Sequence, residues 1–288
     1  MSDQESGNLG SVPDAGNPNP GNPNAGNPNA APAAPTPGDL SIGKVFSLTF
    51  STLFRHFHLF FLLAAVTWLP GIVLVLALPS FQADMMAGVM NPLGIGIYVV
   101  ISWLLVAWLY GSVTHMACVI LANGEISIGA SIKEGLIRAI PVFFILVLQG
   151  IAVAAGFVFL IIPGFIVMVM LAIAVPAGVA ERKGPLAALS RSAALTKGYR
   201  SSIFGVGVLA VLLLIATGIG FGLAAGTLPF TLSGEFNAVV PGTVAIIIGT
   251  LFEAVQYLFL LILAAVLYHQ IRVAKEGSTA EEIAAVFD

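Results

Sequence analysis

Residues 142–180 read VFFILVLQGIAVAAGFVFLIIPGFIVMVMLAIAVPAGVA, and this stretch contains no acidic or basic side chain. It is long enough for two membrane-spanning helices, each of which needs about 20 apolar residues. Pro163 and Gly164 interrupt the run, so we predict a tight hairpin between spans at 142–162 and 165–180. The apolar residues run continuously instead of alternating, which favours helices over the strands of a membrane barrel.

The rest of the chain has the same apolar character. Of its residues, 58% are hydrophobic and 9% are charged, and the mean hydropathy is +1.00. A soluble protein could not cover so much apolar surface. We therefore predict an all-α integral membrane protein with about six transmembrane helices. The predicted spans are 59–78, 93–121, 142–162, 165–180, 203–226 and 243–268.

The positions of the basic residues predict the orientation of the chain. All eleven lysines and arginines fall before the first, third and fifth spans or after the sixth. The other connections between spans carry only Asp84 and Glu235 as charged residues. By the positive-inside rule the basic side is cytoplasmic. We therefore expect a multi-pass protein with its N- and C-termini in the cytoplasm.

Short amphipathic segments precede three of the spans. After Ser41, a residue type that favours a helix N-cap, apolar residues recur at helical spacing over 42–57. The Ser-Ile-Gly sequence of 41–43 recurs at 127–129, and a comparable segment begins at Pro185. The sequence therefore predicts three units, each an amphipathic cytoplasmic helix followed by a two-span hairpin.

Cations on these segments are candidates for contact with lipid or with partner proteins. The segment at 182–200 is the most basic, and each such cation contributes about 1 kcal/mol near an anionic leaflet. The same charges would also control topology, so lipid contact and topology control stand as equal alternatives. The candidate contact residues are Lys44, Arg55, Lys133, Arg138, Arg191, Lys197 and Arg200.

The N-terminal residues differ in composition from the rest. Residues 1–38 contain no lysine or arginine and are dominated by Gly, Asn, Pro and Ala. Such a segment cannot bury enough apolar area to offset its chain entropy. We predict a disordered cytoplasmic tail over 1–38, a helical membrane domain over 39–276 and a short cytoplasmic segment over 277–288. The single cysteine, Cys118, excludes an intramolecular disulfide.

One acidic residue falls inside a predicted span. Glu253, Gln256 and Tyr257 form a polar stripe on the sixth span, because residues three and four apart are neighbours on a helix. An acid inside a span is costly and suggests a polar site that faces a cavity. The alternative is a protonated acid that forms hydrogen bonds between packed helices.

The sequence offers little for catalysis or metal binding. Its four histidines show no metal-ligand spacing. Ser190 and Ser192 have no histidine nearby in sequence to activate them, so we expect surface hydroxyls. We therefore expect no metal, no cofactor, no enzymatic activity and no nucleic-acid partner.

The stretch at 176–198, PAGVAERKGPLAALSRSAALTKG, resembles a pattern shared by the glycerophosphoryl diester phosphodiesterase membrane-domain family and its YciC-like relatives. Residues 40–43, the Pro163-Gly164 pair and 267–277 (LYHQIRVAKEG) agree with that pattern, so the resemblance covers 40–277. It implies a bacterial or archaeal cytoplasmic-membrane protein of largely unassigned activity, without the phosphodiesterase domain to which some members are fused. We expect the bacterial cytoplasmic (inner) membrane. His269-Gln270 departs from the family, in which an aromatic and an acidic residue precede the arginine.

These features favour a non-enzymatic membrane protein that organises lipids or membrane partners through its basic cytoplasmic helices. The alternative is a transporter or permease component with Glu253 near the pathway, since internal repeats and Pro-Gly interruptions are also traits of transporters. A lipid-acting enzyme is the least favoured class, because no pair of nucleophile and base is recognisable.

Overall fold

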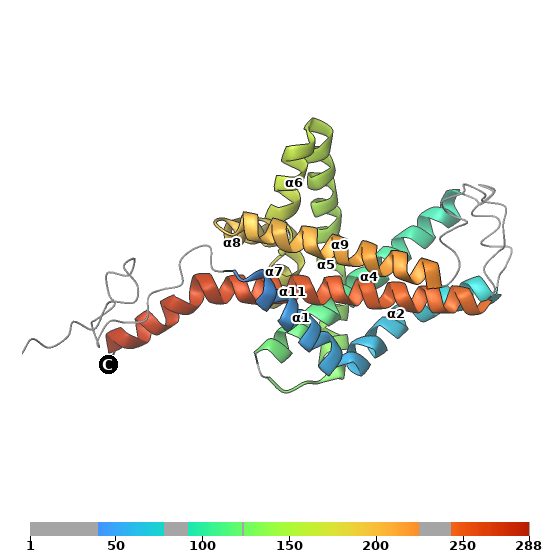
Figure 1. The fold of residues 1–288 in the computed structure, drawn as a ribbon, viewed down its shortest axis with the longest axis horizontal. Coiled ribbons are helices and arrows are strands. Elements are labelled where there is room, and N and C mark those ends of the chain that lie inside the picture. Colours follow the sequence, from blue (N-terminus) through green and yellow to red (C-terminus); the bar gives the residue numbers. More distant parts are fainter. Residues whose placement is uncertain (1–39, 78–91, 123, 225–242, 288) are drawn as a thin grey trace, which may run out of the picture. The chain divides into compact units, whose positions relative to one another are not determined.

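A computed structural model of the protein describes residues 40–77, 92–122, 124–224 and 243–287, and every element in these ranges is a helix (Figure 1). Five helices are long and apolar enough to cross a membrane, or up to six if a bent pair counts as one span. The all-α membrane fold class is therefore confirmed. The predicted tail at 1–38 and the connections that carry Asp84 and Glu235 lie outside the described residues.

All helices of the described residues belong to one compact unit, 37–288. The first, second, fifth and sixth predicted spans each overlap one helix, the third lies in α5 except for its last residues, which begin α6, and the fourth is divided between α6 and α7. The helices are α1 (Ile42–Arg55), α2 (Phe57–Ala77), α4 (Pro92–Leu121), α5 (Ile128–Phe159), α6 (Ile161–Met170), α7 (Ala174–Ala180), α8 (Pro185–Thr196), α9 (Arg200–Ala224) and α11 (Thr243–Phe287).

Serine caps begin α1 and α5. Ser41 Oγ accepts a hydrogen bond from the Lys44 backbone N–H at 3.4 Å, and Ser127 Oγ accepts one from the Ala130 N–H at 3.3 Å. Each serine thereby satisfies an amide group that has no partner within the helix. The N-cap predicted at Ser41 is confirmed, and the repeated Ser-Ile-Gly sequence has the same structural role in both places.

The three predicted units differ where the amphipathic segment joins its span. The chain bends by 77° between α1 and α2, and α8 is separated from α9 by a turn in which Gly198 adopts a φ of 96°. In the second unit, however, α5 is one continuous helix. The prediction of a separate amphipathic helix is wrong there, because the only helix breaker is Pro141, which membrane helices tolerate.

The fourth predicted span is broken between Met170 and Ala174, where α6 ends and α7 begins. Ser192 Oγ and Thr196 Oγ1 of α8 donate to the Met170 carbonyl oxygen at 2.9 and 3.2 Å. These bonds satisfy a carbonyl at the end of α6. Both hydroxyl side chains are buried. The prediction of a surface hydroxyl is therefore wrong for Ser192, because its face of α8 covers the break in the span.

The hairpin between α5 and α6 turns at Leu160, before the predicted Pro163-Gly164 pair. Pro163 lies in the first turn of α6, where its missing N–H would have no partner within the helix. The two helices then approach closely, since a Cβ atom on Gly156 would lie 2.9 Å from the Gly164 Cα atom. Small residues permit such close packing of membrane helices.

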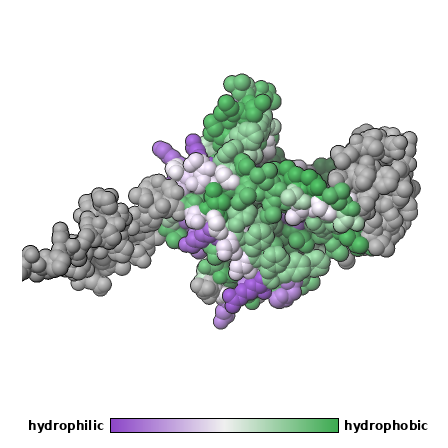
Figure 2. Space-filling model, in the orientation of Figure 1, coloured by the Kyte–Doolittle hydropathy of each residue, from purple (hydrophilic) through white to green (hydrophobic). Residues whose placement is uncertain are grey.

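Large apolar side chains are exposed along the α5–α6 hairpin and α9 (Figure 2). At the hairpin tip, Val158 is 84% exposed and Phe159 is 81% exposed. An apolar surface of this extent suits the hydrocarbon of a bilayer. Hydrophilic residues gather instead around α8 and at the lower edge of the view.

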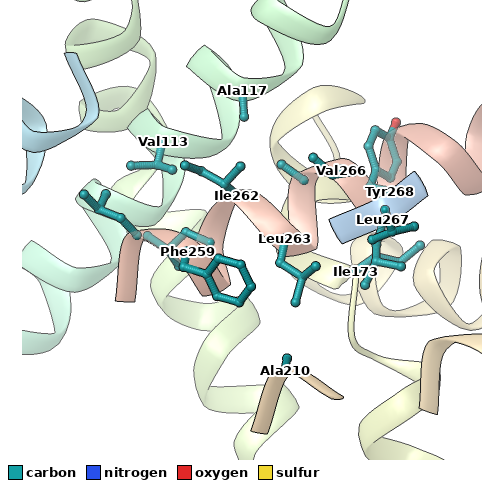
Figure 3. Packing of buried hydrophobic residues seen from close by; sticks show 14 of the residues in the cluster. Val113, Ala117, Ile173, Ala210, Phe259, Ile262, Leu263, Val266, Leu267 and Tyr268 are labelled. Atoms are coloured by element: carbon teal, nitrogen blue, oxygen red, sulfur yellow. The ribbon is translucent and has the colours of Figure 1, made fainter. Parts of the chain in front are cut away.

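Helix α11 supplies the centre of the hydrophobic core. It contacts α1, α2, α4, α7, α8 and α9. Figure 3 shows its side chains Phe259, Ile262 and Leu263 packed between α4 and α9. Ile262 is fully buried. Helix α11 therefore lies at the centre of the core, while α5 and α6 pack mainly on other helices.

Candidate functional site

Helix ends from distant parts of the chain meet around one pocket of about 560 Å³. Its walls come from the second half of α4, the first turns of α5, the end of α7 with the turn that follows, and the last part of α11. Most of the ionisable side chains of this region line the pocket or form an ion pair with a side chain that lines it.

The turn after α7 positions two of the charged side chains. Almost all of α7 is buried, and the helix has its C-cap at Glu181. Arg182 follows with a φ of 54°, and the Lys183 N–H donates to the Gly178 carbonyl oxygen at 3.0 Å. This bond closes the helix end as in a Schellman motif. Pro185 then begins α8 at a position that suits proline.

Glu181 is the acceptor on which most of the nearby donors converge. Arg191 Nε donates to its two carboxylate oxygens at 2.8 and 2.9 Å. Lys183 Nζ lies 2.9 Å from the second oxygen, and the Tyr268 hydroxyl donates to the first at 3.0 Å. The Glu181 side chain is only 12% exposed. One carboxylate therefore joins the turn after α7 to α8 and to α11.

Glu276 and Glu134 accept the remaining charged donors. Glu276 accepts from a terminal nitrogen of Arg191 and, at 3.1 Å, from Arg272 Nε. Glu134 accepts from Nε of Arg138 at 3.2 Å, and its carboxylate also lies 3.7 Å from Nε of the arginine in the turn after α7.

Every ion pair within the described part of the chain belongs to this group of residues, which we name the ion-pair cluster. In it, five basic side chains share three carboxylates, so positive charge is in excess. Its members are Glu134, Glu181, Glu276, Arg138, Arg182, Lys183, Arg191 and Arg272.

Two opposing effects act on the Glu181 carboxyl. Burial acts to raise its pKa, because desolvation disfavours the charged form. Hydrogen bonds from Lys183, Arg191 and Tyr268, together with the charge of Arg191, act in the other direction. They hold the pKa of Glu181 below its ordinary value of 4.5. Glu181 is therefore ionised at neutral pH.

Two histidines line the pocket beside the cluster. His115 Nδ1 lies 3.2 Å from Ser131 Oγ, while His269 Nδ1 is buried without a hydrogen-bond partner. Among the residues that the structure describes, no group of three or more His, Cys, Asp or Glu side chains could hold a metal. The lining includes two carboxylates, which already accept from arginines, and the Tyr268 hydroxyl, which already donates to Glu181. The other polar donors of the pocket are guanidinium and imidazole groups, and these suit an anion.

The residues that carry the family resemblance supply most of this site. Residues 176–198 contribute Glu181 and Arg191, and 267–277 contribute Tyr268 and Glu276. No family model, curated protein or solved structure matches the chain. Membership of the family therefore stays a prediction. The contacts above are those that the resembling residues make in this chain.

The predicted contact cations fall into two groups. Arg138 and Arg191 belong to the ion-pair cluster, and their side chains are 17% and 24% exposed. The other five are exposed at the surface: Lys44, Arg55, Lys133, Lys197 and Arg200. The structure thus places two of the seven in internal ion pairs and leaves five where they can face lipid headgroups.

The predicted intramembrane stripe lies outside the pocket. Glu253 is exposed on α11, about 22 Å along the helix from Tyr268. Gln256 Nε2 donates to Thr217 Oγ1 of α9 at 3.3 Å. The Tyr257 ring packs edge-on against a tryptophan of α2, with 6.4 Å between ring centroids. Two of the three residues therefore serve contacts between helices.

Sequence reasoning did not name Glu134, Arg182, Lys183, Arg272 or Tyr268 as site residues, and it also missed the acids Glu181 and Glu276. The two acids stand beside basic residues at the ends of spans, and this is the signal that could have indicated them. Their pairing was not predictable from that signal, because it depends on how α7, α8 and α11 pack together.

Proposed function

We propose that the chain is a non-enzymatic, multi-pass protein of the bacterial cytoplasmic membrane that organises lipids or membrane partners, with both termini in the cytoplasm. The observation that carries this proposal is the ion-pair cluster. It gathers an excess of basic charge around a pocket at the ends of helices long enough to cross a membrane.

The position of the charge is the physical reason for choosing lipid headgroups. Cations at the ends of membrane spans lie at the depth of the headgroups, where anionic lipids attract them. The exposed cations belong to three different units, since Lys44 lies in α1, Lys133 lies near the start of α5 and Lys197 follows α8. They can therefore act together with the pocket on one leaflet.

The alternative is a transporter or permease component with Glu253 near the pathway. Glu253 does not line the pocket described above, and its side chain is exposed on α11. No observation on the described residues favours this alternative over lipid organisation. If the purified chain transports a substrate in liposomes and Glu253→Gln abolishes that transport, the transporter alternative would be favoured again.

Lipid selection in nanodiscs tests the proposal. The purified chain is reconstituted from an equal mixture of phosphatidylglycerol and phosphatidylcholine, and the lipids retained near the protein are quantified by mass spectrometry. We expect enrichment of phosphatidylglycerol by the natural chain and its loss when Lys44, Lys133 and Lys197 are all replaced by Glu, because the attraction becomes repulsion.

Replacement of the same three lysines by Arg is the matched control, because it keeps the charge. This variant should retain the enrichment. If the natural chain shows no preference for phosphatidylglycerol, or if both triple variants keep it equally, the proposal is wrong. Arg191 is left unchanged in these variants, since its reversal would break the ion pairs with Glu181 and Glu276.

A further inference from the structure

Two arginines of the pocket keep donors that the ion-pair cluster does not use. The Arg182 side chain is 73% exposed, and its Nε atom lies 3.7 Å from a carboxylate oxygen of Glu134. Arg272 is 52% exposed and uses Nε for Glu276, so its terminal nitrogens remain for another acceptor. Arg138 and Arg191, by contrast, are mostly buried within their ion pairs.

The carboxylates that line the pocket are already engaged. Glu134 is held by Arg138 on the same helix, and Glu276 is held by Arg191 from α8 as well as by Arg272. Neither acid therefore cancels the charge of Arg182 and Arg272 fully. An anion that entered the pocket would meet two guanidinium groups, and each of these can donate a pair of parallel hydrogen bonds to a phosphate group.

The backbone at Arg182 gives a second, independent argument. Its φ of 54° lies in the left-handed region, at the position after a helix end where glycine is the usual residue. The chain keeps an arginine here although a glycine would adopt this conformation with less strain. Residues held in such conformations concentrate at functional sites, which is consistent with a use for the guanidinium group beyond closing the helix.

The apolar part of the pocket indicates what the anion is attached to. Much of its lining is formed by Val119 of α4, Ala122 directly after that helix, Val179 of α7 and Val273 of α11. A small hydrated ion gains nothing from such walls, whereas the glycerol and first methylenes of a lipid would be shielded from water by them. A pocket of about 560 Å³ is within the usual size range of ligand sites.

We propose that this pocket binds the phosphate group of an anionic lipid, with Arg182 and Arg272 as the two guanidinium groups that hold it. His115 and His269 line the same pocket and can supply further hydrogen-bond donors. This inference rests on the proposed function, because it names the chemical group of the lipid that one pocket of the basic surface would bind. The inference differs from the proposed function because it requires binding in one defined pocket, whereas the proposed function requires only basic charge distributed over the surface.

Calorimetric titration of the purified full chain in neutral detergent tests the inference. The probes are dioctanoyl phosphatidic acid, dioctanoyl glycerol, which lacks the phosphate, and inorganic phosphate. We expect binding of the phosphatidic acid and none of the dioctanoyl glycerol. Arg182→Gly and Arg272→Gln should each weaken binding by about tenfold or more, since each removes hydrogen bonds to a charged group.

Arg182→Gly is the sharper variant, because glycine suits the left-handed backbone and the variant should fold at least as well as the natural chain. Lys275→Gln is the matched control, since it removes a positive charge from the same helix as Arg272 but does not line the pocket. It should bind as the natural chain does. Equal affinities of all three variants and the natural chain would overturn the inference.

The remaining probes separate the sources of the phosphate and the two proposals. Inorganic phosphate that binds as tightly as phosphatidic acid would overturn the lipid assignment and identify a free-phosphate site. Failure of the natural chain to bind phosphatidic acid, with the phosphatidylglycerol enrichment in nanodiscs intact, would reject the pocket and leave the proposed function standing. Loss of that enrichment as well would reject both.

Discussion

Replacement of Glu181 by glutamine tests whether the ion-pair cluster stabilises the fold. The variant keeps the shape of the side chain but removes the charge that Arg191, Lys183 and Tyr268 share. Arg191, which is 24% exposed, would keep Glu276 as its one charged partner. We expect the free energy of unfolding to fall by about 2–3 kcal/mol. Hydrogen bonds to charged groups contribute about 1.5–3 kcal/mol each, and partial exposure reduces that value.

The measurement is reversible unfolding in detergent micelles at pH 7, followed by the loss of helical circular dichroism. Glu134→Gln is the control, because Glu134 pairs with Arg138 four residues further along the same helix. Glu134 accepts one hydrogen bond from a charged group, whereas Glu181 accepts bonds from several donors, so Glu134→Gln should cost less. Equal losses for the two variants, or no loss for Glu181→Gln, would refute the idea that Glu181 is the energetic centre of the cluster.

Three further results are expected. Because the folded pKa of Glu181 is lowered, its stabilisation is complete above its ordinary value of 4.5 and is lost as the pH falls through the folded pKa. The stability difference between the natural chain and Glu181→Gln should therefore vanish in acid. If the difference vanished near pH 7 instead, the titrating group would not be Glu181. Gly135→Ala should lower the free energy of unfolding by about 1–3 kcal/mol in the same assay, because its Cβ atom would lie 2.8 Å from the Ser112 backbone nitrogen. Gly150→Ala is the control and should leave the stability unchanged, because its Cβ atom would meet nothing within 4 Å. Ser192→Ala should cost about 1 kcal/mol by removing the 2.9 Å bond to the carbonyl at the end of α6, and Ser190→Ala on the exposed face of α8 should cost nothing measurable.

The helices were predictable because a bilayer imposes a length and a composition on each of them. Residues 142–180 contain enough apolar residues for two spans, and the structure has a helical hairpin there. The N-cap at Ser41 was predictable for a local reason, since its hydrogen bond closes within three residues. Properties that depend on one short segment can be derived from the sequence alone.

Properties that depend on packing between distant segments could not be derived in this way. Hydropathy places Glu181 and Glu276 at the ends of spans but carries no information on which cations they meet. The burial of Ser192 has the same origin, because its partner is a carbonyl of another helix, at a break that the apolar composition conceals. Likewise, α5 continues through Pro141, although proline removes a backbone hydrogen bond, and the local sequence did not predict this continuity.

The central position of α11 has a consequence for the order in which this protein assembles. During synthesis α1 and α2 are made before α11, the helix against which each of them packs most, whereas α5 packs mainly on the earlier α4. The contacts of Glu181 with Tyr268, and of Arg191 with Glu276, can form only after that final helix has been inserted. The packing of α1 and α2 is therefore completed only after α11 has been inserted, and so is the pocket that α11 lines, whereas α4, α5 and α6 can pack on one another earlier.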